Sequence, residues 1–360
     1  MNIRNSITPY YRISEDLDHL HKNYQGRIIK LCSNESILGA NPNVMIALQK
    51  EIDKIHLYPN PESAAIKKII ATQLNLDPGS IIFGNGSTEL IELATQELFL
   101  QDGNAVISLY SYPLYEMLVK KYNGTVRVVP MNNWEIDLTK FLNQIDHQTK
   151  AIYLASPNNP TGSWVAFEDL ERFIKQIPKN IMLIIDEAYG EYLEGDPGYA
   201  SLVPLTQRYN NLMVTKTFSK VYGLAGLRIG YAIANNEFIQ KIRRRKQSAN
   251  VNMMAQIAAI IAYQDTDYKN KVIFEVKKSL QLLTKKLAEL NIEFISKSTN
   301  FLLVKTAKHS LQIYKELLKY GIVVQPMDFY NLPEYIRISI GKKEDMVYLL
   351  SIMPEILQDE

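Results

Sequence analysis

The sequence predicts an α/β fold, with a large domain built on a mostly parallel sheet of seven strands and a smaller α+β domain after it. Between about residues 80 and 235, short apolar segments alternate with helical patterns. Polar and apolar residues do not alternate within these segments, which indicates strands covered on both faces, as in parallel sheets. After about residue 240, helical stretches come first and short strands follow. A length of 360 residues also fits about two domains.

The seven strands expected in the large sheet are short and rich in β-branched residues. They cover 80–83, 105–109, 125–129, 151–154, 181–185, 211–215 and 228–234. Helical patterns lie between several of them, at 88–100, 114–122 and 168–176. In such sheets ligands bind beyond the carboxyl ends of the strands, so the loops that follow the strands are the first place to look for chemistry.

The smaller domain is expected to combine helices with a short sheet. The helices cover 238–248, 253–263, 267–290 and 343–356, and the strands cover 293–295, 301–305, 322–325 and 336–340. The first 30 or so residues do not fit the pattern of the large sheet. We therefore expect an N-terminal segment, 1–33, that packs on the small domain, a large domain over 34–240 and a small C-terminal domain over 241–360.

Composition excludes several classes of protein. The formal net charge is +2, which does not suit a nucleic-acid-binding protein, and the basic run 243–246 is interpreted as a solvated helix face. The single cysteine, Cys32, cannot form an internal disulfide, and no His-Glu-x-x-His spacing suggests a metal site. The longest apolar stretches, 181–185 and 252–263, are shorter than the roughly 18 residues of a membrane span. A cytoplasmic protein without membrane or nucleic-acid partners is expected.

The first informative loop, Phe83–Glu89, lies between an expected strand and an expected helix. Its glycines permit a tight turn, and the N–H groups that open the next helix can hold a phosphate. No lysine follows Gly86 as in a nucleotide-binding P-loop, and the third glycine of a dinucleotide fingerprint is absent. Taken alone, this loop is equally a simple turn without a ligand.

Three more loops carry polar groups at strand ends. In Ser156–Gly162, two prolines flank two asparagines, and Asp186 with Tyr189 follows the expected strand 181–185. Lys220 follows Thr217 and Ser219, and Arg228 comes eight positions later, which together would make an anion site that contains an amine. Each loop alone could be structural.

Together, however, the four loops supply the parts of a pyridoxal phosphate site. An amine can form a Schiff base with the cofactor, and a carboxylate can keep the pyridine nitrogen protonated. Side-chain donors can hold the ring oxygen, and an anion site can hold the phosphate. A chance coincidence of all four parts is improbable, so the sequence predicts pyridoxal 5'-phosphate as cofactor and no metal.

The sequence also resembles the fold type I, aspartate-aminotransferase-like enzymes that use this cofactor, and within them the family of histidinol-phosphate aminotransferases. The resemblance extends over nearly the whole chain. It rests on Ile29–Glu35, Leu57–Pro59, Ser156–Gly162, Asp186–Tyr189, Thr217–Lys220 with Arg228, and Tyr335–Gly341.

The resemblance implies a role for each matching residue. Lys220 would be the Schiff-base lysine and proton shuttle, Asp186 would pair with the pyridinium nitrogen, and Tyr112 would stack on the ring. Asn159 and Tyr189 would hold the ring oxygen. The phosphate would be held by Gly86, Ser87, Thr88, Thr217, Ser219, Arg228 and Tyr58 of the partner subunit. The substrate would be bound by Tyr10, Asn34, Gln325 and Arg337, with Arg337 on a carboxylate. A homodimer with shared active sites follows from the role of Tyr58.

The expected activity is transfer of an amino group between glutamate and a keto acceptor, of the histidinol phosphate and imidazole acetol phosphate type. Gln325 stands where the family commonly has an arginine on the substrate side, and Ser36, Ile37 and Val221 also depart from the family pattern. Three alternatives stay open. These are an aminotransferase for an aromatic or other small keto substrate, possibly phosphorylated, a related decarboxylase, and a regulator that only binds the cofactor.

Overall fold

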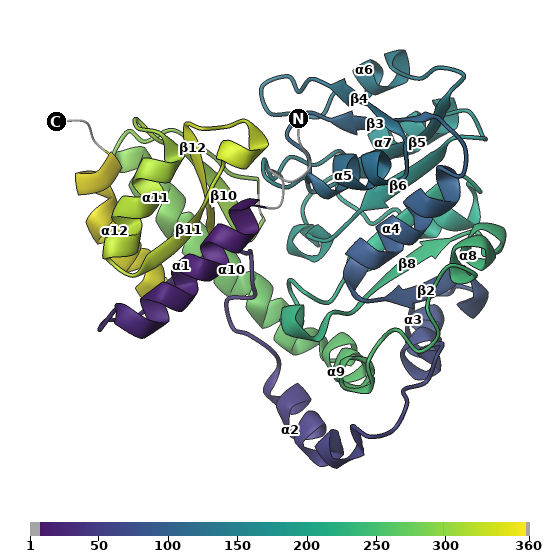
Figure 1. Ribbon diagram of the computed structural model, residues 1–360, viewed down its shortest axis with the longest axis horizontal. Helices are drawn as coiled ribbons and strands as arrows, with labels where there is room; N and C mark the ends of the chain where they lie inside the picture. The colour runs from purple at the N-terminus through teal and green to yellow at the C-terminus, as the bar shows by residue number, and fades with distance from the viewer. Residues whose placement is uncertain (1–7, 298, 358–360) are drawn as a thin grey trace. The chain divides into compact units, whose positions relative to one another are not determined.

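The computed structural model describes residues 8–297 and 299–357, with side chains described from Ile13 onward (Figure 1). Contacts divide the chain into two compact units. The small unit comprises Met1–Ile37, Pro160–Gly162 and Ile273–Glu360, and the large unit comprises Leu38–Asn159 and Ser163–Val272. Tyr10 lies in helix α1 (Thr8–Asn23), but its side chain is outside the described part of the chain.

The large unit contains a seven-stranded sheet in the order β2-β8-β7-β6-β5-β3-β4. The strands are β2 (Ile81–Gly84), β3 (Asn104–Ser108), β4 (Thr125–Val129), β5 (Thr149–Ala155), β6 (Met182–Asp186), β7 (Leu212–Thr217) and β8 (Gly230–Ala234). The five strands from β7 to β4 are parallel, and β8 is antiparallel to both β7 and β2. This confirms the predicted α/β fold.

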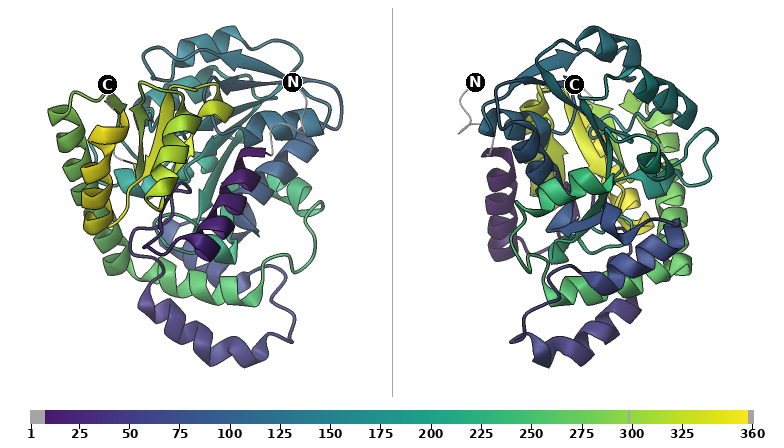
Figure 2. Two further views of the ribbon diagram at one scale, coloured as in Figure 1. Left: turned by 60° about the vertical axis from the view of Figure 1, so that its left-hand side comes forward. Right: turned by 90° about the vertical axis from the view of Figure 1, so that its right-hand side faces the viewer.

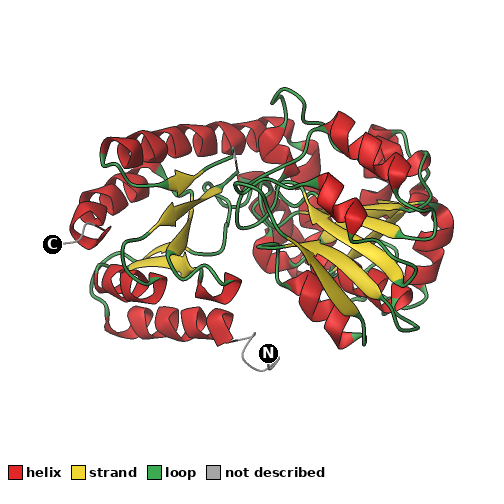
Figure 3. Cartoon of the chain, turned by 90° about the horizontal axis from the view of Figure 1, so that it is seen from above, coloured by secondary structure: helices red, strands yellow, loops and turns green. Residues whose placement is uncertain are grey.

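Helices cover both faces of this sheet (Figure 3). The helices of the large unit that lie between its strands are α4 (Gly86–Leu98), α5 (Leu114–Lys121), α6 (Leu138–Asn143) and α7 (Phe167–Gln176), with α8 (Asn236–Arg243) after β8. Apolar side chains of α4, α5 and α8 form one core with alternate strand residues such as Tyr153, Ile184 and Met213. The intervening strand residues face the other side, part of which contacts the short 3-10 helix η5 (Val203–Gln207).

Three helices of the large unit lie away from the sheet's central core. They are α2 (Pro42–Glu51), α3 (Ala64–Leu74) and α9 (Met253–Gln264). Both α2 and α3 contact α9, and Figures 1 and 2 show α2 against α9 with its other side turned away from the large sheet. Because α8 packs on the large sheet and α9 on α2 and α3, the division of the chain falls after Val272, later than the expected boundary at residue 240.

The small unit contains a five-stranded sheet in the order β1-β11-β12-β10-β9. Its strands are β1 (Ile29–Leu31), β9 (Phe294–Ile295), β10 (Phe301–Lys305), β11 (Ile322–Pro326) and β12 (Tyr335–Ser339). The helices α1, α11 (Ser310–Lys319) and α12 (Lys343–Leu357) belong to this unit, and α10 (Thr266–Glu289) crosses the division. Strand β1 pairs in parallel with β11, so the N-terminal segment contributes an edge strand that the apolar pattern did not reveal.

Within the described part of the chain, no helix is long and apolar enough to cross a lipid bilayer.

Candidate active site

The carboxyl ends of β6 and β7 bring three polar side chains to one edge and one face of the large sheet. Asp186 ends β6, Thr217 ends β7, and Asp186 pairs in register with Thr215. Side chains alternate along a strand, so Thr215 and Thr217 point to the same face of β7. That face is the one covered by α4, α5 and α8, since Met213 and Ile184 belong to that core.

Asp186 is buried, and three donors surround its carboxylate. Oδ2 accepts a hydrogen bond from the Tyr115 hydroxyl at 2.9 Å, while Oδ1 accepts from the Thr215 hydroxyl at 3.2 Å and the Ala188 N–H at 3.1 Å. Burial raises the pKa of Asp186, and the three hydrogen bonds oppose that shift. A carboxylate has about four acceptor sites, so one remains for a further N–H donor.

An anion cradle forms where the first residues of α4 meet the Thr217–Arg228 loop. Gly86 has a φ of +76°, and a Cβ at this position would lie 2.7 Å from Nη2 of Arg228. Nη1 of Arg228 donates to the Ser219 hydroxyl at 3.3 Å, and the Thr217 and Ser219 hydroxyls lie 3.0 Å apart. The side chain of the N-cap residue Asn85 makes no capping hydrogen bond, so the N–H groups of the first turn of α4 remain available to an anion.

The residues of this cradle were all predicted, but one local expectation was wrong. Arg228 does not begin a strand. It follows the 3-10 turn η6 (Ala225–Leu227) in the left-handed conformation, with a φ of +55°, and β8 begins only at Gly230. A Cβ on Gly230 would lie 2.5 Å from the N–H nitrogen of Ser87, so a glycine is required for β8 to approach α4 this closely.

Lys220 lies beside the predicted ring-oxygen donor. Its Nζ is 5.5 Å from the centre of the Tyr189 ring, and the side chain is half-buried. Asn159 is buried in the loop that follows β5, and the Tyr112 ring contacts the Tyr115 ring edge to face at 5.8 Å. Tyr58, by contrast, is 95% exposed, so it is not packed against the predicted cofactor residues of its own chain.

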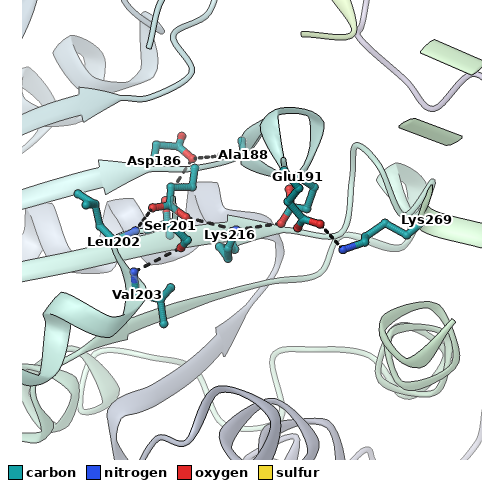
Figure 4. Close-up of polar contacts among 11 residues, drawn as sticks. Asp186, Ala188, Glu191, Ser201, Leu202, Val203, Lys216 and Lys269 are labelled. Atoms are coloured by element: carbon teal, nitrogen blue, oxygen red, sulfur yellow. Dashed lines mark hydrogen bonds and ion pairs between the residues drawn. The ribbon is translucent and has the colours of Figure 1, made fainter. Parts of the chain in front are cut away.

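The opposite face of the same two strands carries a buried ion cluster, which we call the Lys216 cluster (Lys216, Glu187 and Glu191; Figure 4). Nζ of Lys216 lies 3.0 Å from Oε1 of Glu191 and 3.3 Å from Oε2 of Glu187. Glu187 also accepts hydrogen bonds from the Ser201 hydroxyl at 2.5 Å and the Leu202 N–H at 2.7 Å. The cluster ties β7 to the turn that contains Tyr189.

The predicted substrate residues of the small unit lie along β1, β11 and β12. Gln325 pairs in register with Arg337, so the two side chains are neighbours on one face of the sheet. Nη2 of Arg337 donates to the Cys32 carbonyl at 2.7 Å, and its guanidinium lies 5.6 Å from the Phe301 ring centre. Asn34, just after β1, is fixed by Ser339, whose hydroxyl donates to its Oδ1 at 2.9 Å.

Sequence reasoning missed several residues of these networks. Tyr115 and Thr215 donate to the predicted cofactor residue Asp186, and the Lys216 cluster lies on the opposite face of the same strands. Asn300 donates to the carbonyl of the predicted substrate residue Asn34 at 3.0 Å. One of them had a signal in the sequence. Thr215 precedes Thr217 by two residues on a strand, so the two side chains share a face. Tyr112 precedes α5, so its edge-to-face contact with Tyr115 is known only from the structure.

Comparisons with known proteins agree with this architecture. The model of the family "Aminotransferase class I and II" matches residues 26–352, and the chain belongs to this family. The histidinol-phosphate aminotransferase of Caldicellulosiruptor saccharolyticus is 39% identical over 332 residues, which is 92% of each chain.

Solved structures extend the comparison. The histidinol-phosphate aminotransferase from Sinorhizobium meliloti, in complex with pyridoxal-5'-phosphate, superposes with a TM-score of 0.87 at 27% identity and 94% coverage of each chain. Aspartate aminotransferase from Thermus thermophilus shares the fold, with a TM-score of 0.85 at 19% identity and 99% coverage of each chain. The predicted resemblance to these enzymes is confirmed.

Proposed function

We propose that this protein is a histidinol-phosphate aminotransferase that uses pyridoxal 5'-phosphate and glutamate. The observation that carries the proposal is the set of side chains at the carboxyl edge of the large sheet. A lysine, a buried carboxylate with one free acceptor site and an anion cradle come from neighbouring strand ends. The family membership and the 39% identical relative support the substrate class.

The residues fit the cofactor. The remaining acceptor site of Asp186 suits the N–H of a pyridinium ring, and the Tyr112 ring nearby offers a stacking surface. The cradle of Gly86, Ser219 and Arg228 combines helix N–H groups, a hydroxyl and a guanidinium, which suits a phosphate monoester.

Each side chain then has a defined task. Bound pyridoxal phosphate supplies a carbon that accepts an amino group and a ring that withdraws electrons. Lys220 holds the cofactor through Nζ and carries the proton that leaves and returns at the substrate carbon. Asp186 keeps the ring nitrogen protonated, and Arg228 with Ser219 fixes the phosphate. Arg337 binds the substrate carboxylate through its planar guanidinium.

A direct assay tests the proposal. The purified protein should transfer nitrogen from glutamate to imidazole acetol phosphate, and it should do so with higher kcat/KM than to phenylpyruvate. Preference for phenylpyruvate would favour the aromatic alternative. Release of carbon dioxide from a phosphorylated amino acid, without glutamate-dependent transfer, would favour the decarboxylase.

We further propose that the protein works as a homodimer in which Tyr58 of the partner subunit contacts the cofactor phosphate. Support comes from a group of exposed apolar side chains on α2 and the segment after it, an uncommon feature for a surface that faces only water. They are Met45, Ile46, Ile52, Ile55, Leu57 and Tyr58. In Figures 1 and 2 the side of α2 away from α9 is uncovered.

Sedimentation and assay at one protein concentration test the dimer. The active species should sediment as a dimer. Tyr58→Phe should weaken binding of the cofactor without dissociating the dimer. A monomer with full turnover would contradict the proposal.

A further inference from the structure

Tyr115 occupies a position that none of the proposed catalytic roles uses. It lies in the first turn of α5, its side chain is almost completely buried, and its hydroxyl donates to Oδ2 of Asp186 at 2.9 Å. Its ring stacks on Tyr153 at 5.6 Å with an interplanar angle of 17°, and it meets the Tyr112 ring edge to face. Two aromatic neighbours therefore fix where the hydroxyl points.

The hydroxyl can act only as a donor in this contact when Asp186 is ionised. Burial and the neighbouring Asp186 charge raise the pKa of Tyr115 well above its usual value, so the phenol keeps its proton throughout the range in which enzymes work. Burial also raises the pKa of Asp186, and the adjacent Glu187 charge adds to that effect. The donors Tyr115, Thr215 and Ala188 are what hold the carboxylate in its charged form.

The pKa of Asp186 decides whether a proton shared between its carboxylate and a pyridine nitrogen lies on the oxygen or on the nitrogen. If Asp186 becomes more basic, the proton moves from the nitrogen to the carboxylate, and the ring becomes a weaker electron acceptor. If hydrogen bonds from the three donors keep Asp186 ionised, the proton stays on the nitrogen. No other bond changes, and only the position of this one proton differs between the two arrangements.

We propose that Tyr115 is a positioning residue for the aminotransferase reaction, whose hydroxyl holds Asp186 in its ionised form and thereby keeps the proton on the ring nitrogen of pyridoxal phosphate. The inference deepens the proposed function and rests on it. Tyr115 touches Asp186 and the predicted stacking residue Tyr112, and acts through them.

The chain offers a matched control in Tyr153. It is also fully buried and belongs to the same stacked pair, but its hydroxyl hydrogen-bonds the Thr95 hydroxyl on α4 at 2.8 Å instead of Asp186. Tyr115→Phe and Tyr153→Phe each remove one buried hydroxyl from one stacked pair. Only the first removes a donor from the carboxylate.

The experiment loads wild-type protein and both variants with pyridoxal phosphate labelled with ¹⁵N in the ring, and records the nitrogen chemical shift at neutral pH. In Tyr115→Phe the shift should move toward that of an unprotonated pyridine. The kcat with glutamate should fall about ten- to a hundredfold, with KM nearly unchanged, since one hydrogen bond to a charged group is lost. Tyr153→Phe should keep the wild-type shift and kcat.

A wild-type nitrogen shift in Tyr115→Phe, or an equal change in Tyr153→Phe, would overturn the inference and leave the proposed function standing. Failure of wild-type protein to bind the labelled cofactor would overturn the proposed function, and the inference with it. If Tyr115→Phe does not fold, Thr215→Val removes another donor from the same carboxylate. Its shift should move in the same direction, and an unchanged shift would overturn the inference.

Discussion

In the large unit the candidate side chains come from the last residues of neighbouring strands and from the segments that follow them, whereas in the small unit most come from positions on or next to paired strands. Asp186, Thr217 and Lys220 stand at or just after the ends of β6 and β7. Arg337 and Gln325 face each other across β12 and β11, and Arg337 reaches the Cys32 carbonyl from 305 residues away. Strand ends therefore position the predicted cofactor residues, and strand register positions the predicted substrate residues.

The two regions also differ in how they handle charge. The large unit buries Lys216 against Glu187 and Glu191 behind the cofactor residues, and it gives Asp186 three donors. In the small unit the neighbour of Arg337 at the register position is Gln325, a neutral amide. The predicted cofactor residues thus lie beside compensated charges, whereas the predicted substrate residue Arg337 has a neutral neighbour, and we expect a change at position 325 to alter substrate preference. Four variants test this contrast.

Lys220→Ala should have the largest effect. Without the amine, the cofactor has no covalent anchor and the substrate carbon has no proton carrier, so glutamate-dependent transfer should fall by about 10⁴-fold or more. Borohydride treatment should attach the cofactor to wild-type protein, detected by mass, and should not attach it to the variant. Lys175→Ala, on the exposed side of α7, is the control and should retain both properties. Attachment in the Lys220 variant would contradict the assignment.

Lys216→Met should lower the stability of the fold, because Lys216 has no role in the proposed reaction. The change leaves Glu187 and Glu191 buried without their cation, which should lower the free energy of unfolding by about 3–5 kcal/mol. Urea denaturation of the apoprotein measures it. Lys241→Met breaks an exposed pair with Glu237 and should leave the denaturation midpoint unchanged. Equal midpoints for the two variants would show that the Lys216 cluster contributes nothing to the fold.

Arg337→Lys should impair substrate binding without affecting cofactor binding. Lysine keeps the charge but lacks the planar fork, so kcat/KM for glutamate and for the keto acceptor should each fall about ten- to a hundredfold. Cofactor affinity, measured by titration of the apoprotein, should stay at the wild-type value because the predicted cofactor residues belong to the large unit. A parallel loss of cofactor affinity would mean that the cofactor and substrate sides are not independent.

Gln325→Arg should have the smallest effect. It should change which keto acceptor the enzyme prefers without abolishing amino transfer. The new guanidinium would raise kcat/KM for imidazole acetol phosphate relative to phenylpyruvate by about tenfold, since a hydrogen bond to phosphate becomes charge-assisted. Its position opposite Arg337 costs part of that gain through repulsion. Gln325→Lys is the matched variant, with charge but no fork. If the ratio of the two kcat/KM values is unchanged in both variants, the side chain at position 325 does not contact the substrate phosphate.

The sequence by itself determined the order and type of most elements in the large sheet. Apolar runs such as Met182–Ile185, separated by helical patterns, indicate strands covered on both faces, and the polar residues that follow parallel strands meet at one edge of the sheet. Local composition also marked the predicted cofactor residues, because a glycine turn before a helix, an acid after five apolar residues and a lysine after two hydroxyls each stand out within a few positions. The resemblance to a known family assigned their roles.

Only the tertiary structure decided which groups surround the predicted cofactor and substrate residues. That Tyr115 of α5 donates to Asp186, 71 residues later, depends on how α5 packs on the sheet. That Gln325 faces Arg337 depends on the β11–β12 register, and β1 is a strand because β11 offers it an open edge. Such contacts join residues whose separation along the chain carries no signal. They form because burying a polar group without a partner is costly, and the available partners are known only once the chain has folded.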